Sequence, residues 1–186
     1  MAKQGLIFSG AVVVALILII LIWSNYSSEL TIDNASYSRE NMRITITNLL
    51  DKDLLPPINT CDGDDLSPAL EIDEVPQKAQ SLVLIVDDPD ALNGQFIHWL
   101  LWNIPVGTEF IAEGQSPIGA VAGTNSFGRV GYTGPCPPKG THRYIFKLMA
   151  LDTVLDLPVS TTIKELEKAM NEHILSQTEI VARYGR

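Results

Sequence analysis

The sequence predicts a mainly β protein, a β-sandwich with a few peripheral helices, preceded by one N-terminal transmembrane helix. Three observations predict this class: several strand-like segments joined by Pro- and Gly-containing connections, one convincing amphipathic helix late in the chain, and an apolar run at its start. At 186 residues the chain is long enough for one domain with a buried core and too short for two ordinary ones. We therefore expect a single folded domain.

The first predicted element is the apolar segment Leu6–Trp23, which contains no charged residue. As a helix it would span roughly 27 Å, close to the thickness of a hydrocarbon core. A cleaved signal peptide, leading to secretion, is the alternative, but no small-residue cleavage site follows the segment. Lys3 precedes the segment, and Glu29 and Asp33 are the first charges after it, so the positive-inside rule places the body outside the cytoplasm. We therefore expect residues 1–24 to form a single-pass membrane anchor for an extracytoplasmic domain.

A polar stretch over residues 25–40 is typical of a tether, and residues 41–186 then form the globular domain. Within the domain, Arg43–Asn48 alternates apolar and polar residues with the period of a half-buried strand. Five consecutive aliphatic residues, Leu82–Val86, predict a central strand covered on both faces, and Phe96–Ile104 predicts a similar strand.

A further strand is predicted from His142 to Leu151, after a loop too rich in Gly and Pro for regular structure (GRVGYTGPCPPKG). The one convincing helix begins with a capping box formed by Thr162 and Glu165. An apolar face follows, made of Ile163, Leu166, Met170 and Ile174. We expect this helix to pack on the sheet.

Composition restricts the partners of the domain. Removing Lys3 from the 13 basic residues leaves 12 against 22 acidic residues, a net charge of −10 that argues against nucleic acid as a partner.

Cys61 and Cys136 are the only cysteines of the sequence. In an oxidising compartment such a pair permits a disulfide, and two buried free thiols are the alternative that the sequence leaves open.

Three segments concentrate residues suited to chemistry: CDGDDLSP from Cys61, DDPDA from Asp87, and the loop Gly131–Tyr144, which ends in GTHRY. His98 joins them from the strand segment FIHWLLWNIP. These motifs, in this order, resemble the bacterial and archaeal branch of the phosphatidylethanolamine-binding proteins, also called Raf kinase inhibitor-like proteins. The resemblance extends from about Cys61 to the C-terminus, roughly two thirds of the chain.

The resemblance implies an antiparallel β-sandwich whose pocket binds a phosphate-like or carboxylate group. The residues that match the family's pocket positions are Asp88, His98, Tyr132, Gly134, Cys136, Pro137, Pro138, His142 and Tyr144. Family roles include binding of phospholipid headgroups, kinase inhibition, protease inhibition and plant developmental signalling, so the resemblance identifies a site better than a function. It implies no required metal or other cofactor, and we expect a binding protein rather than an enzyme.

The residues themselves also favour an anion-binding pocket. Donors suited to an anion are the backbone N–H of Gly134, the imidazole of His142, and the phenol of Tyr132 or Tyr144. Asp88 would repel such a ligand, so its expected role is to accept a hydrogen bond from His98 or His142 and to fix the tautomer of that ring. A simple turn, in which Asp and Pro serve only local conformation, is the alternative for this segment.

Residues close to these positions have structural explanations. Arg143 alternates with its two neighbours along the strand, so it should point to the opposite face and form a salt bridge. Trp99 and Trp102 are expected in the core or at its rim, and His173 on the surface of the helix. Leu92 stands where proline is common in the family, so the resemblance says least about the shape of the ligand.

Three other functions are compatible with some of these residues. Asp88, His98, Cys136 and His142 are a chemically acceptable zinc set, although their spacing lacks a compact Cys-x-x-Cys element. A hydrolase would use Cys136 as nucleophile and His142 as base, unless Cys136 is bonded to Cys61. An inhibitor would act through surface loops on a protease or kinase-type partner, and extracytoplasmic placement favours a protease.

Overall fold

The computed structural model describes residues 42–92 and 94–186 of the chain. Within these two ranges no helix is long and apolar enough to span a bilayer. The predicted anchor (residues 1–24) and tether (residues 25–40) lie outside the described residues. A compact unit runs from Glu40 to Arg186 and contains the elements that follow.

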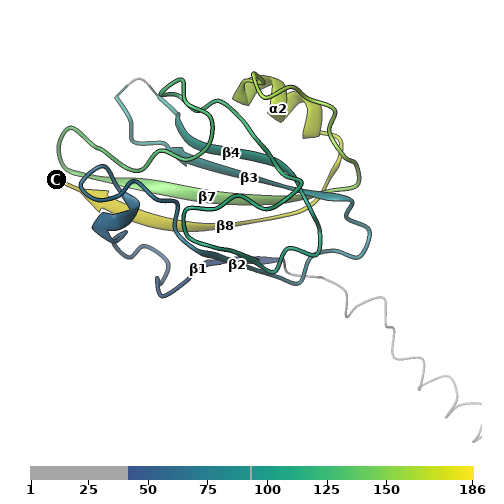
Figure 1. Ribbon diagram of the computed structural model, residues 1–186, viewed down its shortest axis with the longest axis horizontal. Coiled ribbons are helices and arrows are strands. Elements are labelled where there is room, and N and C mark those ends of the chain that lie inside the picture. The colour runs from purple at the N-terminus through teal and green to yellow at the C-terminus, as the bar shows by residue number, and fades with distance from the viewer. Residues whose placement is uncertain (1–41, 93) are drawn as a thin grey trace, which may run out of the picture. The chain divides into compact units, whose positions relative to one another are not determined.

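The described chain forms two antiparallel sheets (Figure 1). The smaller sheet has the order β1-β2-β5, with bounds β1 Arg43–Ile46, β2 Leu70–Asp73 and β5 Phe110–Ile111. The larger sheet has the order β6-β4-β3-β7-β8, with bounds β6 Val121–Ala122, β4 Phe96–Ile104, β3 Ser81–Asp88, β7 Thr141–Leu151 and β8 Ile174–Gly185. The helical elements of the described chain are a short 3-10 helix, η1 (Pro57–Asn59), and the α-helix α2 (Ile163–Met170). The predicted mainly β class with few helices is therefore confirmed.

The predicted central strand β3 is buried along its whole length. Leu82, Leu84 and Val86 share a hydrophobic cluster with residues of the smaller sheet. Val83 and Ile85 belong to a second cluster, which includes the buried face of α2. Because successive side chains of a strand point to opposite faces, an unbroken aliphatic run is what a strand covered on both faces requires.

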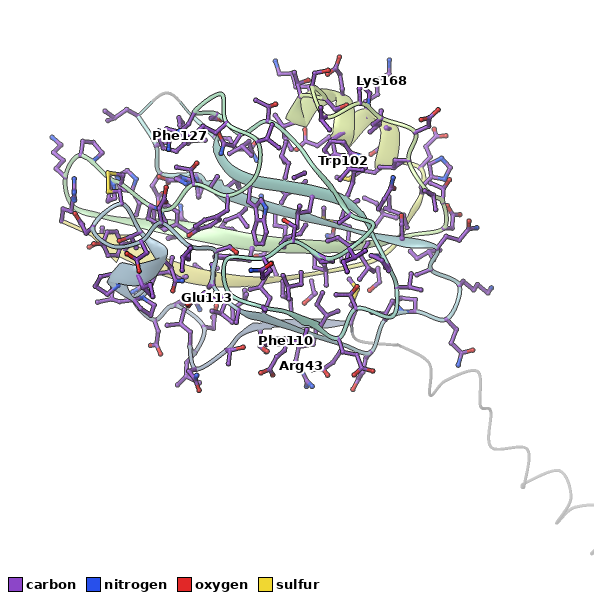
Figure 2. All side chains as sticks on the ribbon, viewed as in Figure 1. Arg43, Trp102, Phe110, Glu113, Phe127 and Lys168 are labelled. Atoms are coloured by element: carbon purple, nitrogen blue, oxygen red, sulfur yellow. A yellow bond between two sulfur atoms is a disulfide. The ribbon has the colours of Figure 1, made fainter. Side chains whose placement is uncertain are left out.

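Strand β4 also contributes residues to both clusters, although its pairing with β3 shifts register at two places. Trp99 packs in the cluster between the two sheets, and Trp102 packs in the cluster beneath α2 (Figure 2). Both indoles are almost fully buried. Of the two predicted locations for these residues, the core is therefore the one observed.

Helix α2 begins as predicted and ends earlier than its apolar pattern suggested. The N–H of Thr162 donates to the Glu165 carboxylate at 2.8 Å, and the N–H of Glu165 donates to the Thr162 hydroxyl at 3.4 Å, which completes the capping box. Ile174, predicted on the helix, is instead the first residue of β8. His173 lies in the turn between the two elements, where its N–H donates to the carbonyl of Met170 and its carbonyl accepts from the N–H of Asp152. This turn reverses the chain, so the helical period does not continue to Ile174.

Strand β8 is the largest element that the sequence pattern missed. Only Ile180 and Ala182 of its residues are buried, so its apolar signal is weak. It is held by antiparallel pairing along the whole of β7, from Thr141 opposite Gly185 to Leu151 opposite Ile174. The short strands β2, β5 and β6 were also not predicted. Strand β7 lies between β3 and β8, but its pairing with β3 starts only at Ile145, so the beginning of β7, Thr141–Tyr144, is held by its pairing with β8.

Candidate ligand-binding pocket

A cavity of about 200 Å³ lies where β3 ends and where β4 and β7 begin. Because β3 runs antiparallel to both neighbours, its last residue, Asp88, lies opposite Phe96 of β4 and close to the beginning of β7. Segments that are far apart in the sequence therefore meet where these central strands end or begin. Seven of the predicted residues line the cavity: Asp88, His98, Cys136, Pro137, Pro138, His142 and Tyr144.

The first polar contact in the cavity joins His142 to Asp88. Nδ1 of His142 lies 2.7 Å from Oδ2 of Asp88, and the two side chains are only 13% and 6% exposed. The other carboxylate oxygen of Asp88 accepts a hydrogen bond from the N–H of Asp90 at 2.8 Å. The expected hydrogen bond between Asp88 and a histidine is thus present, together with the local turn. Because the carboxylate accepts, Nδ1 of His142 is the donor, and Nε2 has no partner within the described chain.

His98 is held differently, by a neutral acceptor. Its Nδ1 lies 2.7 Å from the carbonyl oxygen of Thr133, and a carbonyl can only accept, so Nδ1 carries the proton. Burial lowers the pKa of the His98 imidazole, and the hydrogen bond to Thr133 and the charge of Asp88 oppose this effect only in part. The neutral ring is therefore favoured, with a lone pair on Nε2.

Tyr144 supplies a hydroxyl to the same cavity. Its ring meets the ring of His98 edge to face, with centroids 5.2 Å apart. Burial raises the pKa of the Tyr144 phenol, so the group keeps its proton and can donate. Within the described residues this hydroxyl has no hydrogen-bond partner, and the residue as a whole is 1% exposed. A ligand in the cavity would satisfy it.

Tyr132 and Gly134, also predicted in the pocket, do not line the cavity. The hydroxyl of Tyr132 donates to the carbonyl of Asn59 at 2.7 Å, and the N–H of Gly134 donates to the carboxylate of Asp65 at 2.5 Å. A Cβ at position 134 would lie only 2.5 Å from the carbonyl oxygen of Asn59, so the close approach of the two segments requires glycine. Both donors are therefore used to hold the loop that carries Cys136.

Cys61 and Cys136 form a disulfide across a sequence separation of 75 residues (yellow in Figure 2). The N–H of Cys61 also donates to the carbonyl of Pro135 at 3.1 Å. The bond removes the thiolate that the hydrolase hypothesis needs as nucleophile and that the zinc hypothesis needs as ligand. In the two described ranges, no three His, Cys, Asp or Glu side chains are grouped to hold a metal ion.

The cavity has four further lining residues that were not among those predicted: Ala91, Leu92, Phe96 and Phe127. The rings of Phe96 and Phe127 pack edge to face, with centroids 4.7 Å apart, and form an apolar wall (Phe127 is labelled in Figure 2). Strand alternation could have indicated Phe96, because it lies two residues before His98 and faces the same side of the sheet. Leu92 and Phe127 lie in loops, where no periodic pattern gives the direction of a side chain.

Asn125 is a buried polar residue whose role sequence reasoning missed. Its amide nitrogen donates to the carbonyl of Gly131 at 2.9 Å and to the hydroxyl of Thr133 at 3.0 Å. Its amide oxygen accepts from the N–H groups of Phe127 and Arg129 at 3.0 and 3.1 Å. Asn125 therefore connects the loop that bears the aromatic wall to the segment whose carbonyl orients the buried histidine.

Arg143 forms the predicted salt bridge outside the cavity. Its guanidinium makes a bidentate contact with Asp90, at 2.8 and 2.6 Å. This hydrogen-bonded pair lowers the pKa of Asp90 to about 2. Arg143 is not among the residues that line the cavity, as expected for a strand residue between His142 and Tyr144.

Comparison with known proteins places this geometry in a family. The family model described as phosphatidylethanolamine-binding protein matches residues 45–185. The chain belongs to this family. The match begins well upstream of Cys61, where the resemblance in the sequence was judged to start, and includes part of β1. The family as a whole is known for ligand binding, and the cavity described above is the place where its motif segments meet.

Sequence alignments with related proteins extend over most of this chain. A UPF0098 protein of Pyrococcus horikoshii is 45% identical over 157 residues, which are 79% of this chain and 79% of the relative. A UPF0098 protein of Methanothermobacter thermautotrophicus is 44% identical over 141 residues, or 73% of this chain and 93% of the relative.

Two solved structures show the same fold. A phosphatidylethanolamine-binding protein homologue from Chlamydia trachomatis superposes with a TM-score of 0.76 and 37% identity, covering 79% of this chain and 99% of its own. Escherichia coli YbcL, described as a member of the mammalian family, superposes with a TM-score of 0.74 and 28% identity, covering 78% of this chain and 99% of its own. The two-sheet architecture is therefore shared with these family members.

Proposed function

We propose that this family member is an extracytoplasmic receptor for a small anion, a phosphate-like or carboxylate group, which it binds without chemical conversion. The observation that carries the proposal is the His142–Asp88 pair, which lines the cavity with Nε2 of the ring unpartnered within the described chain. The anion belongs to a free small molecule or to a phospholipid headgroup. The predicted N-terminal anchor would keep the receptor at a membrane.

The electrostatics of the pair suit an anion. In its protonated form, His142 balances the charge of Asp88, and its Nε2–H is free to donate to a ligand. The hydroxyl of Tyr144 is a second donor in the same cavity. Hydrogen bonds to an ionised group are stronger than hydrogen bonds between neutral groups. The apolar walls formed by Phe96 and Phe127 lower the local dielectric constant and strengthen such bonds further.

The residues available support the proposal of binding without conversion. Cys136 is in the disulfide, so the cavity lacks the thiolate of a cysteine hydrolase. His142 is oriented by Asp88 as in a catalytic pair, but among the residues lining the described cavity there is no Ser or Thr for it to activate. We therefore assign the His142–Asp88 pair to binding the anionic ligand.

Isothermal titration of the full chain, in a non-ionic detergent, tests the proposal with phosphate, phosphoethanolamine and acetate. We expect saturable binding, weakened roughly ten- to hundredfold in His142→Ala, because one hydrogen bond to a charged group is lost. The matched control is His173→Ala, since His173 also contacts a carboxylate through Nδ1, at 2.8 Å from Asp152, but lies outside the cavity.

Two outcomes would contradict the proposal. One is the absence of saturable binding for all three anions in the wild-type chain. The other is an equal loss of affinity in His142→Ala and His173→Ala, which would show that the cavity is not the site. Inhibition of a protease or kinase-type partner through surface loops would then be the function to test.

A further inference from the structure

We infer that the pocket selects an oxyanion that still carries one acidic proton, the monoanion of a phosphate monoester, whose P–O–H group donates to Nε2 of His98. The inference rests on the proposed function and names the ligand class of the same site. A phosphate diester and a carboxylate have no such proton at neutral pH. The same chemistry is offered by a free metabolite and by a phosphate monoester group on a larger molecule.

His98 requires a hydrogen-bond donor on the ligand because its tautomer is fixed. Its Nδ1–H is committed to the carbonyl of Thr133 at 2.7 Å, so the neutral ring presents only a lone pair at Nε2. Thr133 is itself fixed, since its hydroxyl accepts from Asn125 at 3.0 Å and its N–H donates to the carbonyl of His98 at 3.0 Å. The ring cannot exchange donor and acceptor without breaking this arrangement.

The other polar groups of the cavity have the opposite character. The Tyr144 hydroxyl is a donor, and Nε2 of His142 is one when the ring is protonated, whereas Nε2 of His98 is an acceptor. The ligand that satisfies all three must therefore accept at least two hydrogen bonds and donate one. A phosphate monoester monoanion has oxygens that accept and a single hydroxyl that donates, which is this pattern.

The charges around the cavity also favour a monoanion over a dianion. No Lys or Arg lines the cavity in the described chain. Arg143 is paired with Asp90, and Lys147 with Asp87. The charges that act on His98 come from Asp88, Asp65 and Asp87, all acidic, and Tyr144 is the titratable ring in contact with it.

A second negative charge on the ligand would therefore be poorly compensated. A positive charge on His142 would lie beside the carboxylate of Asp88, 2.7 Å away, so it would not also neutralise a dianion. The remaining walls are largely apolar and include Phe96, Phe127 and Pro137. An unpaired charge in such surroundings is costly, and keeping the proton on the ligand removes that cost.

The test compares methyl phosphate, dimethyl phosphate and acetate by isothermal titration of the full chain in a non-ionic detergent. Measurements run from about pH 5 to about pH 8, because the second ionisation of a phosphate monoester lies near pH 6. The quantity measured is the ratio of the affinities for methyl and dimethyl phosphate. Titration of groups that do not contact the ligand affects both ligands alike, so the ratio reports the one proton that the monoester complex shares between ligand and His98 and that the diester complex lacks.

At about pH 5.5 we expect methyl phosphate to bind roughly ten- to hundredfold more tightly than dimethyl phosphate, as one charge-assisted hydrogen bond would give. Above about pH 6 the ratio should decrease, and the decrease should approach tenfold per pH unit, because the monoanion is depleted. His98→Gln, in a sample that still unfolds cooperatively, should abolish the pH dependence of the ratio. The wild-type ratio stands as a test even if this variant does not fold.

The alternative outcomes are distinguishable. A ratio that favours methyl phosphate equally at every pH would overturn the inference, because exclusion of the larger diester by size would explain it. Equal affinity for all three probes would also overturn it, while leaving the anion-receptor function in place. No saturable binding of any probe would overturn both the inference and the proposed function.

Discussion

Two histidines that line one cavity have different chemical roles because their Nδ1 atoms meet different acceptors. Nδ1 of His142 contacts the carboxylate of Asp88, whereas Nδ1 of His98 contacts the neutral carbonyl of Thr133. His98 is also more deeply buried. The first histidine is therefore suited to bind an anionic group, and the second is suited to accept a hydrogen bond from the ligand.

The lowered pKa of His98 predicts a loss of stability in acid. Burial disfavours the charged ring, so below the ordinary histidine pKa of about 6.5 the unfolded chain binds a proton more readily than the folded chain. The free energy of unfolding should therefore fall as the pH drops from about 7 to about 5, and His98→Gln should make this slope shallower. Urea denaturation across this range measures it.

The control for this experiment is His173→Gln, which removes a half-exposed histidine far from the cavity in the fold. It should not make the slope shallower, because this side chain is not buried. Equal slopes for the wild type and His98→Gln would show that the buried ring does not resist protonation, and the assignment of a neutral His98 would be wrong.

Asn125 should be important for both stability and binding, although it is not a lining residue. Asn125→Ala leaves the N–H groups of Phe127 and Arg129 and the carbonyl of Gly131 without their partner. A polar group left without its partner costs up to about 1–3 kcal/mol when it is buried, and these groups are partly exposed, so we expect a loss of about 1–3 kcal/mol in the free energy of unfolding.

Chemical denaturation and anion titration of Asn125→Ala measure the two effects. Because the substitution frees the segment that orients His98, anion affinity should fall as well as stability. Asn171→Ala, at an exposed asparagine in the turn after α2, is the control and should change neither. Unchanged anion affinity in a destabilised Asn125→Ala protein would limit Asn125 to a structural role.

At the scale of elements, the pocket depends on the docking of two irregular segments. The loop that contains Tyr132, Gly134 and Cys136 is joined to the segment that begins at η1 by a disulfide and by hydrogen bonds to Asn59 and Asp65. The opposite end of the loop enters β7, which is paired on both sides. The loop is therefore shaped by long-range contacts at one end and by the sheet at the other.

Replacing both Cys61 and Cys136 by Ser should destabilise the domain by about 2–4 kcal/mol, the usual effect of removing a disulfide that closes a long loop. The pocket should persist, because the hydrogen bonds of Tyr132 and Gly134 still join the same segments. Thermal unfolding and anion titration check the two parts. The wild-type chain in reductant is the matched control, and a complete loss of binding in both samples would show that the disulfide itself shapes the site.

At the scale of the whole molecule, the hydrophobic core is contained in the described chain from Met42 onwards. We therefore predict that residues 41–186 fold alone, with a cooperative urea transition. A fragment that starts at residue 48 is the control, because it lacks Met42, Ile44 and Ile46, which are at most 4% exposed. Each such side chain contributes about 1.5–3 kcal/mol, so this shorter fragment should be largely unfolded. Cooperative folding of both fragments would mean that β1 is dispensable.

The sequence by itself determined the elements whose signals are local. The aliphatic run of β3 and the capping box of α2 reflect burial and hydrogen bonding within a few residues, so they could be predicted. The motif residues also indicated most of the cavity, including Asp88 and His142. Strand β8 was not predicted, because pairing with β7 rather than its own apolar pattern stabilises it.

Only the tertiary structure decided which partner each polar group meets. Tyr132 and Gly134 come from the same loop as Cys136, yet their donors contact Asn59 and Asp65 and leave the cavity to other residues. His98 obtains its tautomer from a carbonyl 35 residues away. Hydrogen bonds between such distant residues depend on the packing of the sheets and loops around them, and no spacing in the sequence encodes that packing locally. The sequence therefore determined which residues could take part in binding, and the fold determined which of them donate, which accept, and which hold the site together.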